Sequence, residues 1–158
     1  MADSTPYVVM QGITKRYPGV VALDQLDFAA NRGEVMALVG ENGAGKSSLL
    51  KVLAGAVRAD EGTIQIDGKP VTITHPRDAQ RLGIAVIYQE LNLANHLSVA
   101  ENIFLGRTPS RGGFVNFKAM AAETAVLLQD LGIRATANSI VGQLNVANRQ
   151  MVEIAKAV

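Results

Sequence analysis

One eight-residue segment constrains the fold of this chain more than any other feature of its sequence. The segment reads GENGAGKS at residues 40–47 and matches the pattern G-x-x-x-x-G-K-[ST] at every fixed position. A nearly uninterrupted apolar stretch precedes it at residues 34–39, and a helical pattern follows it at residues 47–53. This order predicts a buried strand, a glycine-rich loop and a helix, which together form a cradle for phosphate groups.

The residue types in this segment suit phosphate chemistry. Its three glycines permit backbone angles that turn successive N–H groups toward one anion. Lys46 is placed to reach the β- and γ-phosphates of a nucleotide, Ser47 to bind Mg²⁺ and Ser48 to donate to the α-phosphate. The helix that follows adds the positive end of its dipole. The glycine spacing does not fit the dinucleotide fingerprint G-x-G-x-x-G.

Composition narrows the class of protein further. The chain has 158 residues, about one domain's length, with 15 Lys and Arg against 14 Asp and Glu. This near balance gives no overall electrostatic reason to expect nucleic acid or a membrane surface as a partner. Cysteine is absent from the sequence, which excludes disulfides, thiolate metal ligands and cysteine nucleophiles. Because we find neither a secretory signal nor an apolar run of about 18 residues, we expect a soluble domain of cytoplasmic type.

The pattern along the chain is β-rich at first and mostly helical later. Apolar stretches on either side of a Pro-Gly turn, at residues 7–10 and 20–28, predict two antiparallel strands. Residues 63–67 alternate apolar and polar side chains and lead into an Asp-Gly pair, which indicates a surface hairpin. A second short apolar run at residues 84–88 predicts another strand that is buried on both faces.

Helix signals dominate the second half. Pro76 marks a helix start, Gly83 a helix end, and Ser98 and Glu101 have the spacing of a capping box. Together with apolar residues at helical spacing, these signals predict helices at residues 77–82, 98–105, 116–131 and 147–158, and a loop at residues 108–113.

Five segments carry a resemblance to a known family. They are ITKRYPGVVALD (13–24), GENGAGKSSLLKVLAG (40–55), HPRDAQRLGIAVIYQELNL (75–93), LSVAENIFLGR (97–107) and QMVEIAKAV (150–158). The first two resemble many ABC cassettes, the ATP-binding subunits of ABC transporters. The middle segments resemble those of bacterial monosaccharide importers, in the ribose/xylose/galactose-like branch. The chain looks like the N-terminal part of the first cassette of such a subunit, which implies ATP and Mg²⁺ as ligands.

The resemblance implies roles for residues outside the loop as well. Tyr17 falls where the family has an aromatic residue that stacks on adenine. Gln89 matches the glutamine of the family's Q-loop, which contacts Mg²⁺ and couples the cassette to the permease. The expected nucleotide-binding residues are thus Tyr17, Gly40, Asn42, Gly43, Ala44, Gly45, Lys46, Ser47, Ser48 and Gln89, with Ser47 and Gln89 as the expected Mg²⁺ ligands.

Two features depart from the family's pattern. The family has a signature close to L-S-G-G-Q, which acts on nucleotide held by an opposite cassette. This chain has a degenerate version of it that contains Asn145, Ala147 and Asn148. Asn145 can still cap a helix, but the methyl group of Ala147 hinders close approach of the backbone to a phosphate. The family's Asp-Glu strand end and later histidine are not among these 158 residues, so we expect no catalytic residue in this chain.

The expected fold is an α/β P-loop NTPase of the ABC cassette type, truncated, with an antiparallel β subdomain and a helical lobe. The β-rich and P-loop core is expected at about residues 7–97 and the helical lobe, up to the signature helix, at about residues 98–158. The resemblance implies membrane permease subunits, a second cassette and, indirectly, a periplasmic sugar-binding protein as partners, and no nucleic acid. It implies a cytoplasmic location, peripheral on the inner membrane through the permease.

Three functions are compatible with these observations to different degrees. The first is an ATP-binding subunit that energises sugar import, of which this chain alone binds ATP weakly and does not hydrolyse it. The second, motivated by the altered signature, is a degenerate P-loop module that binds ATP to signal or assemble without hydrolysis. The third, a P-loop kinase or GTPase, lacks an acceptor or base-specificity motif, and the two strands before the loop fit an ABC cassette better. The sequence does not name the sugar.

Overall fold

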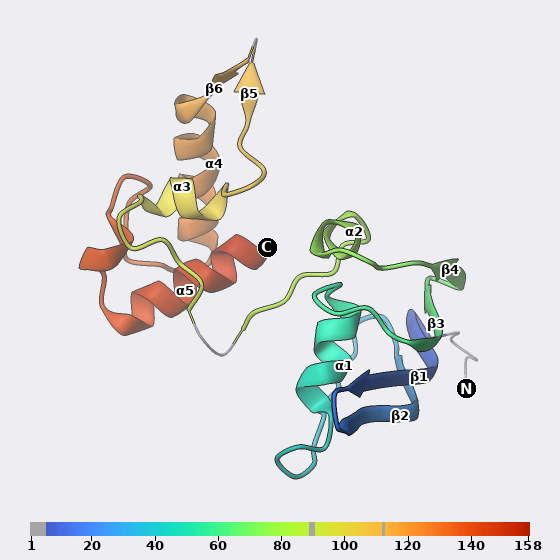
Figure 1. The fold of residues 1–158 in the computed structure, drawn as a ribbon. Helices are drawn as coiled ribbons and strands as arrows, with labels where there is room; N and C mark the ends of the chain where they lie inside the picture. Colours follow the sequence, from blue (N-terminus) through green and yellow to red (C-terminus); the bar gives the residue numbers. More distant parts are fainter. Residues whose placement is uncertain (1–5, 89–90, 112) are drawn as a thin grey trace. The chain divides into compact units, whose positions relative to one another are not determined.

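The structure, a computed structural model, describes residues 6–88, 91–111 and 113–158. The chain divides into two compact units, Met1–Ala85 and Val86–Val158. In Figure 1 the first unit holds the blue to green elements and the second unit the yellow to red ones. Within the described residues, we find no helix long and apolar enough to cross a membrane.

An antiparallel sheet of four strands forms one side of the first unit. The strand order is β2-β1-β3-β4, and every neighbouring pair is antiparallel. The strands span Val8–Tyr17 (β1), Val20–Ala30 (β2), Glu61–Ile66 (β3) and Lys69–Val71 (β4). The predicted strand pair around the Pro-Gly turn is therefore confirmed, and both strands are longer than the apolar pattern indicated.

The hairpin predicted at residues 63–67 also forms, but it is not a surface feature. Its strands β3 and β4 continue the sheet beyond β1, and Ile64 and Ile66 are only 8% and 6% exposed. The alternation of side chains was interpreted correctly as a strand with one polar face. Its apolar face belongs to the core because β3 pairs with β1, a partner far away in sequence.

A bulge in β1 brings two core residues to the same face. Met10 and Ile13 are both fully buried although they are three residues apart, a spacing that places side chains on opposite faces of a regular strand. The register of β1 shifts between these two residues against β2, and Gly12 within the shift has a left-handed φ of 60°. The amide of Gly12 donates to Asp27 Oδ1 at 2.7 Å, which holds the bulge.

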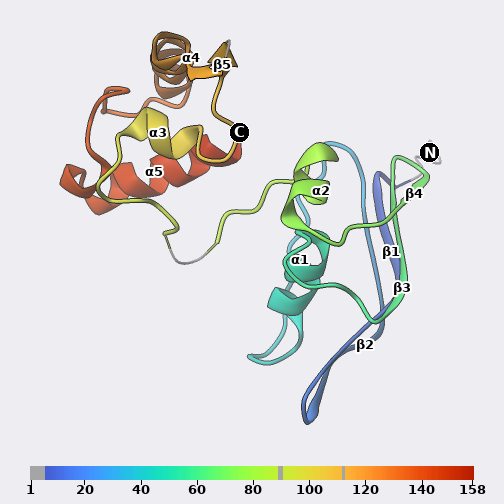
Figure 2. The ribbon, with the colours of Figure 1, turned by 45° about the horizontal axis from the view of Figure 1, so that its top comes forward.

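Two helices, α1 (Lys46–Leu53) and α2 (Pro76–Arg81), complete the first unit. Figure 2 shows both on one side of the sheet. Both confirm the positions predicted from the sequence to within one or two residues. Their apolar faces join the sheet in one core, whose buried members are Met10, Ile13, Leu23, Leu49, Val52, Ile64, Ile73 and Ala79.

The two predicted buried strands do not form. Residues 34–39 and 84–88 have no regular secondary structure, and Val35, Val39 and Ile87 are 98%, 92% and 53% exposed. A strand that is buried on both faces needs hydrogen-bonded neighbours and helices on both sides. Among the described residues neither stretch pairs with another strand, so the apolar pattern alone did not suffice.

The second unit is mainly helical. Its elements are α3 (Val99–Ile103), β5 (Ser110–Arg111), β6 (Phe114–Val115), α4 (Phe117–Asp130), the 3₁₀-helix η1 (Val141–Gln143) and α5 (Val146–Ala157). The helices at residues 98–105, 116–131 and 147–158 are thus confirmed, whereas the loop at residues 108–113 contains half of a small hairpin. The buried core consists of Val99, Ala100, Ile103, Phe104, Met120, Leu128, Ile133, Val141, Val152 and Ala155.

Side-chain caps begin α3, α4 and α5. The Ser98 hydroxyl accepts a hydrogen bond from the Glu101 amide at 3.2 Å, and the Glu101 carboxylate accepts one from the Ser98 amide at 2.8 Å. This reciprocal pair is the predicted capping box. Asn116 caps α4, and Asn145 caps α5 by accepting from the Asn148 amide at 2.8 Å.

Candidate functional site

The glycine-rich loop is exposed over residues 40–44 and leads directly into the N-terminus of α1. Gly43 and Gly45 have φ angles of 91° and 81°, in the left-handed region that favours glycine. The Ala44 amide donates to the Glu41 carbonyl oxygen at 3.2 Å, which closes the turn between them. Because the first turn of a helix leaves its N–H groups without partners inside the helix, this end of α1 offers donors to an anion.

Gly45 also fixes the loop against the sheet. A Cβ atom at this position would touch the carbonyl oxygen of Ala22 and would lie 2.8 Å from Cδ2 of Leu23. Only glycine allows the start of α1 to approach β2 this closely. The sheet therefore sets the position of the loop backbone, and a side chain at Gly45 would displace it.

Lys46 points back over the loop. Its Nζ donates to the carbonyl oxygens of Gly40 at 2.6 Å and of Glu41 at 2.7 Å. A lysine ammonium group has three donors, so these two bonds hold the charge in place and leave one donor for a further acceptor. A positive charge fixed at a loop that leads into a helix N-terminus suits a phosphate oxygen.

The two serines after Lys46 stand at the same end of α1. Ser47 is exposed and Ser48 is half-buried. A serine hydroxyl next to bound phosphate oxygens is a suitable Mg²⁺ ligand, since Mg²⁺ commonly takes one protein oxygen together with phosphates and waters. The described residues contain no group of three or more His, Cys, Asp or Glu side chains that could hold a metal ion by themselves. The loop thus fits a metal that arrives with phosphate.

Tyr17 is the last residue of β1 and is 37% exposed. The Nζ atom of Lys15 lies over its ring, 5.6 Å from the ring centroid. Lys15 is paired across the sheet with Leu23, the residue that packs against Gly45. Through these two contacts, β2 links the end of β1 to the start of α1 within one unit.

The other predicted site residues are not joined to this group. Gln89, the expected Q-loop residue, lies outside the described residues. Asn145, Ala147 and Asn148 begin α5 in the second unit. There, Asn145 and Ala147 are exposed, and the Asn148 amide nitrogen Nδ2 donates to the Arg134 carbonyl oxygen at 3.3 Å. The side-chain oxygen of Asn145 is engaged in its own helix cap.

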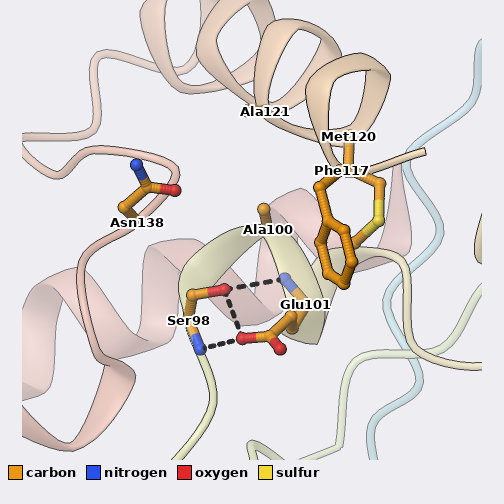
Figure 3. Close-up of a pocket in the computed structure, with 7 residues that line it drawn as sticks. All are labelled: Ser98, Ala100, Glu101, Phe117, Met120, Ala121 and Asn138. Atoms are coloured by element: carbon orange, nitrogen blue, oxygen red, sulfur yellow. Dashed lines mark hydrogen bonds between the residues drawn. The ribbon is translucent and has the colours of Figure 1, made fainter. Parts of the chain in front are cut away.

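A hollow of about 240 Å³ lies in the second unit, beside α3 and the start of α4. Figure 3 shows the capping box of Ser98 and Glu101 at its edge, with the ring of Phe117 on the other side. It is smaller than the roughly 300–1,000 Å³ of ordinary ligand pockets. None of the predicted nucleotide-binding residues lines it, and two of its polar residues, Ser98 and Glu101, are occupied in capping α3.

Sequence reasoning missed the partner of Lys15. Its ammonium group forms an ion pair with Asp60 Oδ1 at 2.8 Å, and the Arg16 amide donates to the other oxygen of the same carboxylate at 2.7 Å. The hydrogen bond from Lys15, with that from the Arg16 amide, lowers the pKa of Asp60. Only the antiparallel pairing of β1 with β3 could have indicated this contact, because the residues are far apart in sequence.

Comparisons with known proteins identify the family of this chain. The family model described as ABC transporter matches residues 23–158. Two curated relatives are a ribose import ATP-binding protein RbsA 1 of Rubrobacter xylanophilus, 57% identical over 96% of this chain, and a putative ribose/galactose/methyl galactoside import ATP-binding protein 1 of Burkholderia ambifaria, 53% identical over 94%. The chain spans only 30% and 29% of their respective lengths.

A solved structure supports the fold. A nucleotide-free ATP-binding cassette from an ABC transporter superposes with a TM-score of 0.79 at 25% identity, covering 97% of this chain and 64% of that one. The ABC cassette fold expected from the sequence is therefore confirmed over the matched part. Since the family model covers most of the sequence and the relatives are more than half identical to it, this chain belongs to the ABC transporter family of ATP-binding cassettes.

Proposed function

We propose that this chain is part of an ATP-binding subunit that energises the import of a sugar. The observation that carries the proposal is the phosphate loop, in which Lys46 is held by the carbonyl oxygens of Gly40 and Glu41 above the N-terminus of α1. The printed names of the relatives, which are ribose and ribose/galactose import ATP-binding proteins, support the sugar importer as the setting.

In this proposal each part of the site contacts one part of the nucleotide. The remaining donor of Lys46 and the N–H groups of the loop bind the β- and γ-phosphates. Ser47 ligates Mg²⁺ together with phosphate oxygens, and Ser48 donates to the α-phosphate. The exposed ring of Tyr17 stacks on adenine, a contact worth roughly 1–3 kcal/mol for bases on aromatic side chains elsewhere. When bound, Mg²⁺ would supply charge neutralisation on the phosphates.

The partners follow from the same family. We propose that the complete subunit docks on permease subunits in the inner membrane and pairs with a second cassette, and that a periplasmic sugar-binding protein delivers the solute. Gln89 would couple the nucleotide to the permease. The start of α5, with Asn145, Ala147 and Asn148, would face the nucleotide of the opposite cassette, but with the Asn145 oxygen already accepting from Asn148.

The 158-residue chain by itself should bind ATP weakly and not hydrolyse it. Attack of water on the γ-phosphate needs a positioned group to take or orient the proton. Both histidines, His75 and His96, lie outside the loop and β1, and the described residues around the loop offer no carboxylate after a buried strand. Hydrolysis therefore depends on residues beyond those that form this site.

Calorimetry with ATP and Mg²⁺ tests the proposal. Wild-type chain should bind ATP, and Lys46→Ala should abolish the binding because it removes the charge held at the loop by the Gly40 and Glu41 carbonyl oxygens. Lys51→Ala is the matched control, since Lys51 is an exposed lysine in the last turn of the same helix. If both variants bind ATP as the wild type does, the loop is not a nucleotide site. Phosphate release that survives repurification and disappears in Lys46→Ala would contradict the absence of hydrolysis.

A further inference from the structure

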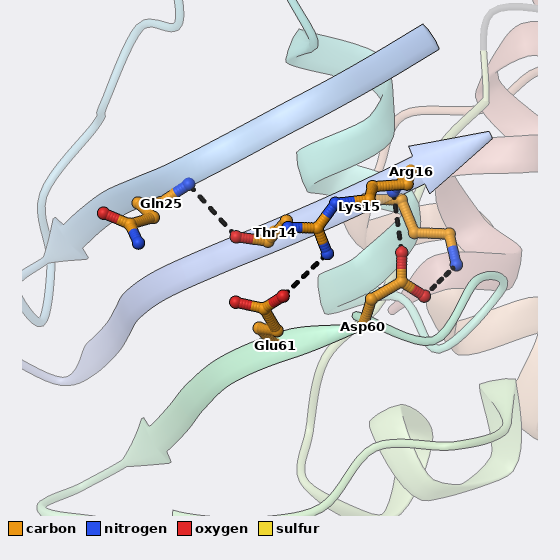
Figure 4. Close-up of polar contacts among 6 residues, drawn as sticks. All are labelled: Thr14, Lys15, Arg16, Gln25, Asp60 and Glu61. Atoms are coloured by element: carbon orange, nitrogen blue, oxygen red, sulfur yellow. Dashed lines mark hydrogen bonds and ion pairs between the residues drawn. The ribbon is translucent and has the colours of Figure 1, made fainter. Parts of the chain in front are cut away.

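The Asp60 carboxylate binds both a side chain and a backbone amide near the end of β1. Asp60 accepts a hydrogen bond from Lys15 Nζ at 2.8 Å through Oδ1 and one from the Arg16 amide at 2.7 Å through Oδ2 (Figure 4). Only 14% of the Lys15 side chain is exposed. The Asp60 side chain is 37% exposed, but its carboxylate accepts two hydrogen bonds and its cation is mostly buried, so this pair is better held than a fully exposed surface pair.

The same lysine limits the movement of Tyr17. Lys15 and Tyr17 are two residues apart on β1, so their side chains project from the same face of the strand. Lys15 Nζ lies over the ring, 5.6 Å from its centroid, a distance at which a cation is attracted to an aromatic ring. Because Asp60 fixes the ammonium group, the ring has a fixed cation on one side while 37% of the residue stays exposed.

This arrangement lies one strand away from the phosphate loop. Lys15 pairs with Leu23 across β1 and β2, and Leu23 packs against Gly45 at the start of α1. Lys15 itself is a poor phosphate ligand, because the Asp60 carboxylate already neutralises its charge. Its position suits the other end of a nucleotide, where the contact is with a flat ring.

We propose that Lys15 and Asp60 are positioning residues for nucleobase binding, which hold Tyr17 where it stacks on the base of a nucleotide whose phosphates lie in the loop. The proposal rests on the proposed function and goes beyond it by assigning base affinity to a pair that does not touch the nucleotide. A ring held in place before binding loses less conformational freedom on binding than a free one. The two hydrogen bonds lower the pKa of Asp60, which favours the charged form that pairs with Lys15.

The test compares ATP with inorganic tripolyphosphate, both with Mg²⁺, by calorimetry on the 158-residue chain. Asp60→Asn and Lys15→Met should weaken ATP binding about three- to tenfold, which is part of the full value of a stacked base. Their affinity for tripolyphosphate should stay within about twofold of wild type, because that ligand has no base. Lys15→Arg, which can keep the ion pair and the cation over the ring, should retain ATP affinity.

Glu61→Gln is the matched control. Glu61 follows Asp60 directly and pairs with Arg16 at 2.7 Å, but both side chains are about half exposed, at 54% and 52%. The Asp60→Asn and Glu61→Gln substitutions change the net charge equally. Glu61→Gln should leave the affinity for both ligands unchanged. In a Tyr17→Leu background, Asp60→Asn should cause no further loss of ATP affinity, because the ring that it positions is gone.

The outcomes separate the inference from the proposed function. Equal weakening of ATP and tripolyphosphate by Asp60→Asn and Lys15→Met would overturn the inference, since the pair would then support the loop or the fold. No change in ATP affinity, an equal effect of Glu61→Gln, or a full effect of Asp60→Asn without the Tyr17 ring would overturn it too. A wild-type chain that binds neither ligand overturns the proposed function itself, and the inference with it.

Discussion

Strand β1 and the stretch at residues 34–39 both contain several apolar residues, yet only one of them forms a strand. Met10 and Ile13 in β1 are completely buried, whereas Val35 is 98% exposed. The antiparallel partner of β1 follows after a two-residue turn, so the pairing costs little chain entropy. A strand between parallel neighbours needs partners that arrive through long crossovers. The comparison shows that an apolar run can indicate a segment able to join a sheet, but it does not indicate whether neighbouring strands are there to pair with it.

The stretch at residues 84–88 repeats this outcome. Ile87 is 53% exposed and no regular strand forms. Hydrogen-bonding partners for the two stretches would have to be residues other than those described. The cassette structure with the same fold has about a third of its length outside the matched part, since the chain covers 64% of it. We expect the two exposed stretches to differ most from the matching segments of that cassette structure.

The largest expected effect comes from truncating one side chain in β1 and one in the stretch at residues 34–39. Ile13→Ala should lower the free energy of unfolding by about 2–5 kcal/mol, because Ile13 is fully buried and leaves a cavity. Val35→Ala should change it by no more than about 0.5 kcal/mol, since the side chain has almost no contacts to lose. Chemical denaturation of the two variants and the wild type measures both values. A loss of several kcal/mol at Val35 would show that residues 34–39 are packed in solution.

Local signals in the sequence predicted most of the fold correctly. The capping box of Ser98 and Glu101, the Asp-Gly hairpin turn and the Asn145 cap each depend on residues within a few positions of one another. Such contacts are specified by short segments. The predictions that failed, at residues 34–39 and 84–88, depended on partners elsewhere in the sheet.

In the candidate site, too, local features were predicted from the sequence and contacts that depend on the path of the backbone were not. The motif predicted which residues form the loop, and the left-handed angles of Gly43 and Gly45 agree with its glycine spacing. It did not predict that Lys46 binds two loop carbonyls, because that depends on the backbone path. Nor did it predict the bond from Lys15 to Asp60, because the pairing of β1 with β3 shifts register between Gln11 and Thr14.

An effect of intermediate size is expected for a local contact, the Ser98 cap of α3. Ser98→Ala should lower the free energy of unfolding by about 1 kcal/mol, because it removes the hydroxyl that accepts from the Glu101 amide at 3.2 Å. Glycine is tolerated at a helix N-cap, so Ser98→Gly should lower the free energy of unfolding by only a few tenths of a kcal/mol. Denaturation curves of the three proteins provide the comparison. Equal losses in both variants would indicate that the serine stabilises α3 through packing and not through its cap.

The smallest expected effect is the dependence of stability on pH that this capping box causes. The Glu101 carboxylate accepts from the Ser98 hydroxyl at 2.6 Å and from the Ser98 amide at 2.8 Å. These bonds, in that order, lower the pKa of Glu101 below its ordinary value of 4.5, and His96 adds a smaller favourable charge. A carboxyl whose pKa is lower in the folded state stabilises the fold above its ordinary value. It loses this contribution as the pH falls through the folded pKa.

Glu101→Gln removes the titrating group while it keeps a side chain of similar size. As the pH is lowered below the ordinary carboxyl value, the unfolding midpoint of the wild type should therefore fall more steeply than that of the variant. Asp60 and Asp78 also have lowered pKa values, so both proteins lose stability in acid and only the difference between them belongs to Glu101. Thermal unfolding over a pH series measures this difference. If the variant is as acid-sensitive as the wild type, the Glu101 carboxylate does not stabilise the N-terminus of α3. The capping box would then be a wrong prediction from the sequence, as the strands at residues 34–39 and 84–88 were.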